Sequence, residues 1–189
     1  MNDSSVRFQL SRESKRKIYT TTIISVVLVL TIGQRHAGFL IFILLLPFAA
    51  WLTYSAYVIV RRPYARWAQV ICLAIWVLAI GLVGAIHYVW HENARRDANQ
   101  IVKAIESYSE IYNHCPRALE TLGIKREQLV AKLGENAGYT CIDRKPRFFY
   151  VATFTIFDTF AYDFDEGVWE YESWADKRKF LDTKPAGSK

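Results

Sequence analysis

The sequence lacks the short motifs that carry familiar catalytic chemistry. It has no glycine-rich phosphate loop, no G-x-S-x-G nucleophile turn and no H-E-x-x-H zinc motif. Its three longest apolar runs also lack Asp, Glu, Lys and Arg, which argues against an ion or substrate pathway, because such pathways usually need ionisable groups within the membrane. We therefore expect a protein that is not an enzyme and that binds no cofactor.

Basic charge is not concentrated in the C-terminal half. The first ninety residues contain nine Lys or Arg against two Asp or Glu, whereas the rest of the chain contains fifteen against sixteen. A nucleic-acid-binding domain needs a basic patch on its folded part, so we expect no nucleic-acid partner. The basic excess lies beside the apolar runs, where it determines membrane topology.

The apolar runs predict three transmembrane helices, at residues 18–35, 39–60 and 67–90. About 20 helical residues are needed to cross the hydrocarbon core of a bilayer. The first uncharged run, Ile18–Gly33, is shorter and reaches this length only if Gln34 and Arg35 are included. A cleaved signal peptide is the alternative for this run, but the residues after it lack the small-x-small pattern that cleavage requires.

Positive charges predict the orientation. Residues 1–17 form a basic leader, and the loop Arg61–Arg66 contains three arginines. Positively charged loops stay in the cytoplasm. We therefore expect a multi-pass protein of a bacterial-type inner membrane with a cytoplasmic N-terminus and a periplasmic domain at residues 91–182. Residues 183–189 are small and polar and are expected to be disordered.

Cysteine is rare, with three residues in the chain. Cys72 lies in the third apolar run, where a thiol behaves as a small apolar group. Cys115 and Cys141 both lie in the expected periplasmic domain, where an oxidising environment favours a disulfide. Two reduced, buried thiols are the alternative.

The first part of the expected outer domain has apolar residues at helical spacing. Six residues recur at intervals of four and three, as on one face of a helix: Ala94, Ala98, Ile101, Ile105, Tyr108 and Tyr112. We expect this helix to continue the third transmembrane helix. Pro116 and Gly123 frame a short helix at residues 115–122, and Gly134 ends another at residues 125–133.

Strand signals follow Gly138. The expected strands are 139–142, 147–157, 160–164 and 168–174, with Asp165-Glu166-Gly167 as a three-residue hairpin loop. Trp169 and Tyr171 alternate with acidic residues on the last strand. The predicted fold class is a membrane α-helical region plus an α+β outer domain, with a long helix packed on a three- or four-stranded antiparallel sheet.

Residues 92–174 resemble the soluble domains of pilins and type II secretion pseudopilins. The likeness lies in the layout, in the stretch Ala98–Tyr108 and in the Cys115-Pro116 pair. It implies a helix that leaves the membrane and packs on an antiparallel meander. Pilins have one membrane helix and an N-terminal processing site, which this chain does not share, so no functional residue is transferred.

Two sequence features suggest metal or thiol chemistry, each with a simpler interpretation. His87 and His91 are four residues apart on a helix, but a metal site usually needs three or four ligands. His114 precedes Cys115, but a catalytic dyad needs proximity in space rather than in sequence. The acidic residues before Gly167 lack the spacing of a calcium loop and are interpreted as a solvated hairpin. We expect no metal.

The remaining surface candidates are aromatic and acidic residues, because protein interfaces favour Trp and Tyr. The predicted partner-binding residues are Tyr162, Asp165, Glu166, Trp169, Tyr171 and Trp174. Burial of the aromatic residues in the core is the alternative. The sequence therefore favours a membrane-tethered protein that binds another protein. An immunity protein against a membrane- or periplasm-acting toxin comes first, an accessory subunit of a pilus or secretion assembly second, and a membrane enzyme third.

Overall fold

The computed structural model describes residues 11–62 and 65–173. The chain divides into two compact units, one ending at Ile86 and the other beginning at His87. The first ten residues of the expected leader, the expected disordered tail and Trp174 lie outside the described residues.

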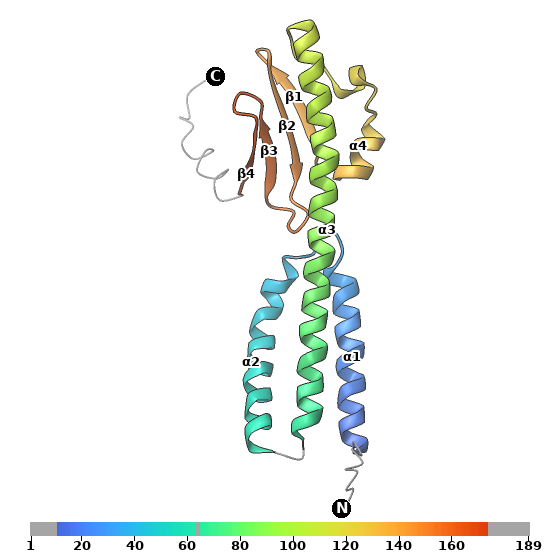
Figure 1. The fold of residues 1–189 in the computed structure, drawn as a ribbon, viewed down its shortest axis with the longest axis vertical. Coiled ribbons are helices and arrows are strands. Elements are labelled where there is room, and N and C mark those ends of the chain that lie inside the picture. The colour runs from blue at the N-terminus through green and yellow to red at the C-terminus, as the bar shows by residue number, and fades with distance from the viewer. Residues whose placement is uncertain (1–10, 63–64, 174–189) are drawn as a thin grey trace, which may run out of the picture. The chain divides into compact units, whose positions relative to one another are not determined.

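Three helices supply the described residues of the N-terminal unit: α1 (Arg12–Ile32), α2 (Leu40–Arg61) and the first part of α3 (Arg66–Tyr112) (Figure 1). By length and composition, α2 and α3 are the helices of the described chain that are apolar enough to cross a membrane. Helix α1 begins inside the predicted leader, where the Ser11 side chain accepts a hydrogen bond from the Ser14 amide. Its first turns are basic, and this leaves a short apolar part.

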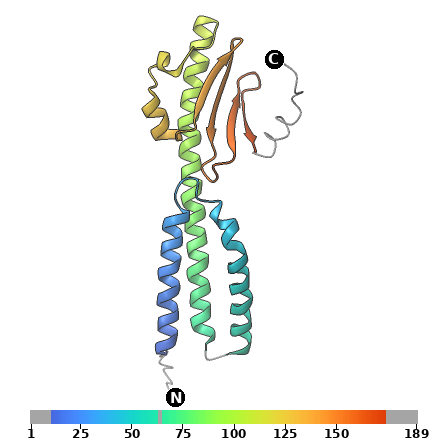
Figure 2. The ribbon, with the colours of Figure 1, turned by 180° about the vertical axis from the view of Figure 1, so that it is seen from behind.

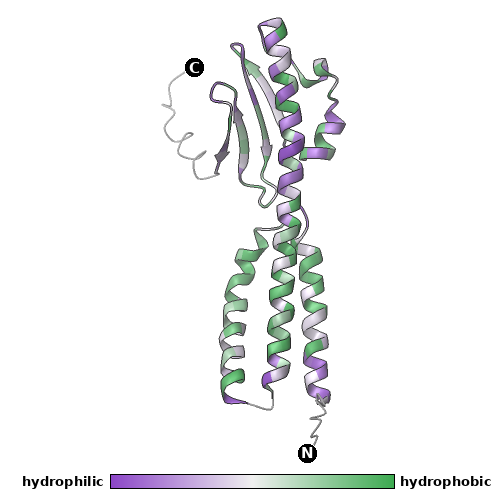
Figure 3. Ribbon diagram, viewed as in Figure 1, coloured by the Kyte–Doolittle hydropathy of each residue, from purple (hydrophilic) through white to green (hydrophobic). Residues whose placement is uncertain are grey.

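Apolar side chains on α2 and α3 point outward. Only 11% of the most apolar part of α2 and 17% of that of α3 is buried. Leu46, for example, is 81% exposed. Figure 3 shows α2 and the first half of α3 as largely hydrophobic. A helix in the core of a soluble protein buries such residues, so outward apolar faces of this kind suit a lipid environment.

Polar side chains within the N-terminal unit are paired between helices. Gln69 of α3 donates a hydrogen bond of 2.6 Å from Nε2 to Oγ of Ser55 on α2, and Ser55 is fully buried. The Thr21 hydroxyl of α1 lies 3.5 Å from Sγ of Cys72. Polar contacts of this kind join helices in an apolar environment, where an unpaired group is costly.

Helix α3 runs without a break for 47 residues. The predicted helical face is buried at Ala94, Ala98, Ile101 and Ile105, all at 5% exposure or less. The burial ends before Tyr112, which is 57% exposed. The prediction that the outer helix continues the third apolar run is confirmed.

The segment between α3 and the sheet contains a 3₁₀ helix, η1 (Leu119–Leu122), and α4 (Arg126–Leu133). The predicted helix at 115–122 is wrong for its first four residues, which are not helical. Gly123 ends η1 with a φ of +75°, a left-handed conformation that glycine adopts without strain. Helix α4 ends at the glycine that was predicted to stop it, Gly134.

Four strands form one antiparallel sheet in chain order: β1 (Gly138–Ile142), β2 (Lys145–Val151), β3 (Thr159–Asp163) and β4 (Val168–Glu172) (Figure 1). The predicted long helix with a three- or four-stranded antiparallel sheet is therefore confirmed, with four strands.

Each predicted strand differs from the structure at one end or both, and the largest differences are at the end of β2 and at the hairpin between β3 and β4. Strand β2 ends at Val151 rather than Phe157, because the chain must reverse before it pairs as β3. The Ala152 amide donates to the Asp158 carbonyl at 2.9 Å and closes this reversal. The hairpin between β3 and β4 has four loop residues, Phe164–Gly167, rather than three.

The core of the C-terminal unit lies around the outer part of α3, which runs between the sheet and α4 (Figures 1 and 2). It combines small and β-branched residues of α3 with leucines of the connecting helices and large rings of β2. Its members are Ala94, Ala98, Ile101, Val102, Ile105, Leu119, Leu129, Leu133, Ala137, Phe148 and Tyr150.

Phe148 is fully buried at the centre of this core. We expect Phe148→Ala to lower the free energy of unfolding of the C-terminal unit by about 3–5 kcal/mol, because it leaves a cavity that helix and sheet cannot close. Pulse proteolysis of the full chain in urea and detergent measures this change. Ile142→Ala is the control, since Ile142 is 66% exposed. Equal losses in both variants would contradict the assigned core.

Candidate binding surface

Most aromatic residues of the sheet lie on the face that packs against α3; Phe149 of β2 is on the opposite face. Strand register aligns Phe148, Tyr162 and Trp169 in one row across β2, β3 and β4. Their rings are in contact, with 5.2 Å between the centroids of Tyr162 and Trp169 and 6.1 Å between those of Phe148 and Trp169. The row is therefore part of the contact between sheet and helix.

Polar atoms of this row are bonded to α3. Trp169 donates from Nε1 to Oδ1 of Asn99 at 2.8 Å, and the Arg95 guanidinium lies 4.9 Å from the centre of its ring. The Tyr162 hydroxyl donates to Oε1 of Glu106 at 3.1 Å. Two of the predicted partner-binding residues thus have their polar ends engaged within the domain.

Burial and nearby charges shift the pKa of two tyrosines on this face, Tyr162 in the row and Tyr150 next to it. Burial raises the pKa of Tyr162, and its hydrogen bond to the Glu106 carboxylate raises it further. Burial likewise raises the pKa of Tyr150, while the nearby Arg95 guanidinium opposes this rise. Both phenols therefore stay neutral and hold the sheet on the helix.

Tyr171 is the more accessible aromatic residue, at 55% exposure. Its hydroxyl donates to Oδ2 of Asp158 at 2.6 Å. This hydrogen bond, followed by partial burial, raises the pKa of Tyr171 to about 12. The ring contacts Phe160 at 5.3 Å between centroids, so one side packs on the domain while the other faces solvent.

The predicted acidic hairpin is exposed, and its backbone is held by one side chain. Oδ1 of Asp163 accepts hydrogen bonds from the amides of Asp165, at 2.7 Å, and Glu166, at 3.0 Å. Asp165 also pairs with Lys145 of β2 at 3.1 Å. Both acidic residues predicted to bind a partner are therefore on the surface. Trp174, the last predicted one, lies outside the described residues.

The opposite face of the sheet carries a shallow open depression of about 420 Å³. Charged residues of β2 and β4 border it, and the small side chain of Ala161 lies between them. Its principal polar side chains are Thr140, Lys145, Arg147, Glu170 and Glu172. We call this surface the charged sheet face.

Cross-strand contacts order the charged sheet face. Arg147 forms an ion pair with Glu172, and the Thr159 hydroxyl donates to the other oxygen of the same carboxylate at 3.3 Å. Lys145 and Arg147 both have side chains more than half exposed. The charged sheet face therefore exposes charges of both signs rather than a basic patch.

The charged sheet face was not predicted from the sequence, although the charge pattern of its strands indicates it. Acidic residues alternate with Trp169 and Tyr171 along β4, and Lys145 and Arg147 are separated by one residue on β2. Because successive side chains of a strand point to opposite faces, these charges must lie opposite the aromatic rows. The missing information was which face of the sheet α3 would cover.

Two groups considered for metal binding have other contacts. His87 meets the Phe154 ring edge-on and His91 meets the Phe160 ring at a tilt, with 5.2 Å and 5.5 Å between the ring centroids. Near the hairpin, carboxylate oxygens of Asp163, Glu166 and Glu170 lie within 4.8 Å of one another. Asp163 already holds the hairpin amides, and we assign no metal to this exposed cluster.

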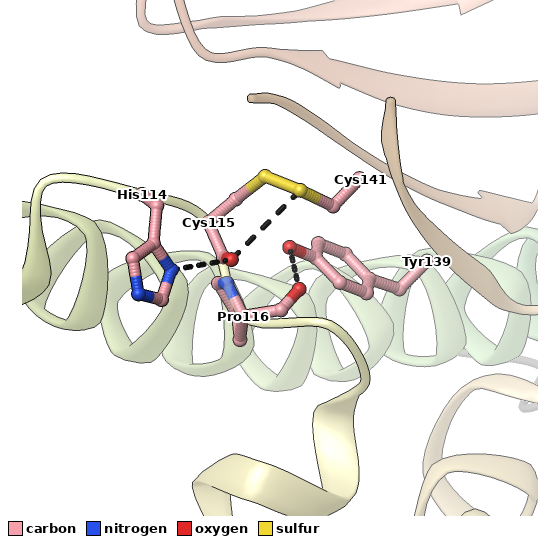
Figure 4. The surroundings of a disulfide bond; sticks show 5 residues. All are labelled: His114, Cys115, Pro116, Tyr139 and Cys141. Atoms are coloured by element: carbon pink, nitrogen blue, oxygen red, sulfur yellow. Dashed lines mark hydrogen bonds between the residues drawn. A yellow bond between two sulfur atoms is a disulfide. The ribbon is translucent and has the colours of Figure 1, made fainter. Parts of the chain in front are cut away.

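A disulfide joins Cys115 and Cys141, as expected from the sequence (Figure 4). Their Cα atoms are 6.1 Å apart, and the bond links the segment after α3 to the edge strand β1. Beside it, the Tyr139 hydroxyl donates to the Pro116 carbonyl at 2.9 Å. Burial, with a smaller contribution from Tyr108, raises the pKa of Tyr139 to about 12. Because the Cys115 sulfur is part of this disulfide, it is not a free thiol that could act as a nucleophile beside His114.

The disulfide closes a loop with a sequence separation of 26 residues. We expect the double variant Cys115→Ala, Cys141→Ala to lose roughly 3–4 kcal/mol of unfolding free energy, because its unfolded chain is less restricted. Pulse proteolysis of the full chain in detergent, with and without reductant, measures the change. Reductant should destabilise the wild-type protein to the same degree and leave the variant unaffected. Insensitivity of the wild-type protein would contradict a stabilising disulfide.

The hydrogen bond between Tyr171 and Asp158 predicts a measurable titration. A folded-state pKa of about 12 lies above the ordinary 10.0, so the contribution to stability is complete below pH 10 and is lost as the pH rises through about 12. We expect Asp158→Asn to move the ionisation of Tyr171 down toward 10. Phenolate absorbance of each form, minus that of its Tyr171→Phe counterpart, isolates this residue. Identical Tyr171 curves for the wild-type carboxylate and the Asp158→Asn carboxamide would contradict the assigned bond.

Comparisons of the chain with known protein families, curated proteins and solved structures found no match. The pilin-like layout noted in the sequence therefore stays a prediction. What can be said of function depends on the geometry of the charged sheet face and of the apolar helices.

Proposed function

We propose that this chain is a non-enzymatic inner-membrane protein whose periplasmic C-terminal unit binds another protein, and that it acts as an immunity protein against a membrane- or periplasm-acting toxin. The observation that carries the proposal is the charged sheet face. It combines an open depression of about 420 Å³ with exposed charges of both signs on a sheet fixed to a long helix.

Membrane tethering is the first part of the proposal. Helices α2 and α3 have the length and composition to span a bilayer. We propose that α1 is a third span, with its apolar part at 18–32 and the adjoining basic residues at the cytoplasmic surface. The arginines of the loop 61–66 support a cytoplasmic position for that loop as well. This topology places the C-terminal unit in the periplasm, a compartment that permits the disulfide.

Protein binding is the second part. The disulfide and the core around α3 preorganise the sheet, so a partner meets a surface that needs little ordering. Lys145 and Arg147 on β2 face Glu170 and Glu172 on β4, and this pattern selects a partner with the complementary arrangement. Tyr171, half-exposed on the opposite face of the edge strand β4, offers a separate aromatic contact of the type that dominates interface energies.

A paired charge reversal tests this surface. Cells that produce the chain should survive challenge by toxins secreted from neighbouring strains, and we expect Lys145→Glu with Glu170→Lys to reduce survival roughly tenfold or more, because complementarity is inverted. The matched control is Lys103→Glu with Glu120→Lys, which also preserves net charge at exposed positions. Both proteins must reach equal levels in the membrane. Equal protection by both variants would rule out the charged sheet face as the binding surface.

An accessory subunit of a pilus or secretion assembly is the second candidate. The arrangement that favours it is a long helix packed on an antiparallel meander in chain order, as the sequence resemblance implied. Affinity purification of the full chain from its own envelope distinguishes the candidates. Recovery of resident pilus or secretion subunits, lost in the paired charge reversal, would favour the assembly function. Recovery of a foreign secreted polypeptide would favour neutralisation.

A further inference from the structure

The loop between β2 and β3, residues 152–158, exposes large apolar side chains. Ile156 and Phe157 are each 51% exposed. The Ala152 amide donates to the Asp158 carbonyl at 2.9 Å, and the Phe157 amide donates to Oγ1 of Thr155 at 3.2 Å. The backbone is thus held in a reversal that directs apolar groups outward. A loop that only connects two strands in water is usually polar, so exposed large apolar side chains in it indicate a contact with another apolar surface.

The position of this loop along α3 is fixed by a ring contact. Phe154 lies 5.2 Å from His87 between ring centroids. His87 belongs to the last turn of the apolar run 67–90, and its neighbours Tyr88 and Val89 are 67% and 54% exposed. The loop therefore lies at the level of the helix where the apolar run ends. In a spanning helix this level is the membrane–water interface, where aromatic residues gather.

We propose that the 152–158 loop is an interfacial anchor, and that Ile156 and Phe157 insert among the headgroups of the bilayer that α3 crosses. The proposal rests on the membrane location proposed above and adds a second attachment point for the C-terminal unit. One spanning helix alone leaves a domain free to tilt about it. A loop that enters the same interface at a second point limits this tilt and holds the charged sheet face at a defined orientation.

The chemistry of the loop favours lipid over a protein partner. Residues 152–157 contain no charged side chain and combine two threonines with three large apolar residues, a composition suited to the boundary between headgroups and acyl chains. The carboxylate that follows, Asp158, accepts a hydrogen bond from Tyr171, so the nearest negative charge is engaged. The exposed charges suited to a protein partner lie on the charged sheet face instead.

Depth-dependent fluorescence quenching in the full chain tests this anchor. Ile156→Cys carries an environment-sensitive fluorophore in a Cys72→Ser background, and the protein is placed in lipid nanodiscs. Glu166→Cys at the hairpin is the control for solvent, and Leu78→Cys, at a position on α3 that is 73% exposed, is the control for membrane insertion. We expect lipids with a headgroup-proximal spin label to quench position 156 at least about twofold more than position 166. Lipids labelled deep in the acyl chain should quench position 78 most.

The outcomes separate the anchor from the membrane proposal. Quenching at 78 with equal, weak quenching at 156 and 166 overturns the anchor and leaves the membrane location intact. Protection of position 156 from aqueous iodide without quenching by lipid also overturns it, because protein then covers the loop. Absence of lipid quenching at 78 overturns the membrane location and the anchor together.

Discussion

The C-terminal unit depends on the packing of the outer part of α3 against strand β2. Ala94 and Ala98 are almost completely buried, and their small side chains leave room for Phe148 and Tyr150, which are fully buried in the sheet. Small residues on a helix and large rings on a strand fill the space between them without voids. Because the contact uses successive turns of α3, the helix has to stay regular as it leaves the apolar run, and it does so for 47 residues.

That contact also decides how the two faces of the sheet are used. The aromatic face is satisfied by α3, since Asn99, Glu106 and Arg95 meet the polar atoms or rings of Trp169 and Tyr162. The charged sheet face is not covered by α3, and the side chains of Lys145 and Arg147 on it are exposed. Ion pairs on such an exposed surface add little stability. Specificity and association rate are the properties that charge complementarity improves most.

Periodicity in the sequence predicted the helices and strands well where one face is apolar. The buried face of the outer helix, the stop of α4 at Gly134 and the alternation along β4 were all confirmed. It failed in β2, because the run Phe148–Phe157 is apolar at nearly every position and contains no signal for the reversal at Ala152. The helix predicted at Cys115–Ala118 failed for a different reason. Cys115 is bonded to Cys141, and local helix preference does not reveal a constraint from so distant a residue.

The aromatic residues of the sheet show where sequence reasoning reaches its limit. Alternation places Trp169 and Tyr171 on one face, but it does not state whether that face meets a helix or a partner. The deciding residues lie about seventy positions earlier, where Arg95, Asn99 and Glu106 recur at intervals of four and seven on α3. A polar row beside an apolar row on one helix predicts a neighbour with polar-tipped rings. Pairing two such distant patterns requires the fold itself.

Antiparallel topology gives the interfacial loop a consequence for recognition. The loop joins one end of β2 and β3, whereas the acidic hairpin at Phe164–Gly167 joins the opposite end of β3 and β4. Strands of five residues at about 3.3 Å per residue separate these ends by roughly 17 Å. If the loop rests on the bilayer, Asp165 and Glu166 are carried away from the membrane surface, which is commonly anionic and would repel them. On the proposed function, a protein partner would then meet the hairpin and the charged sheet face from the solvent side.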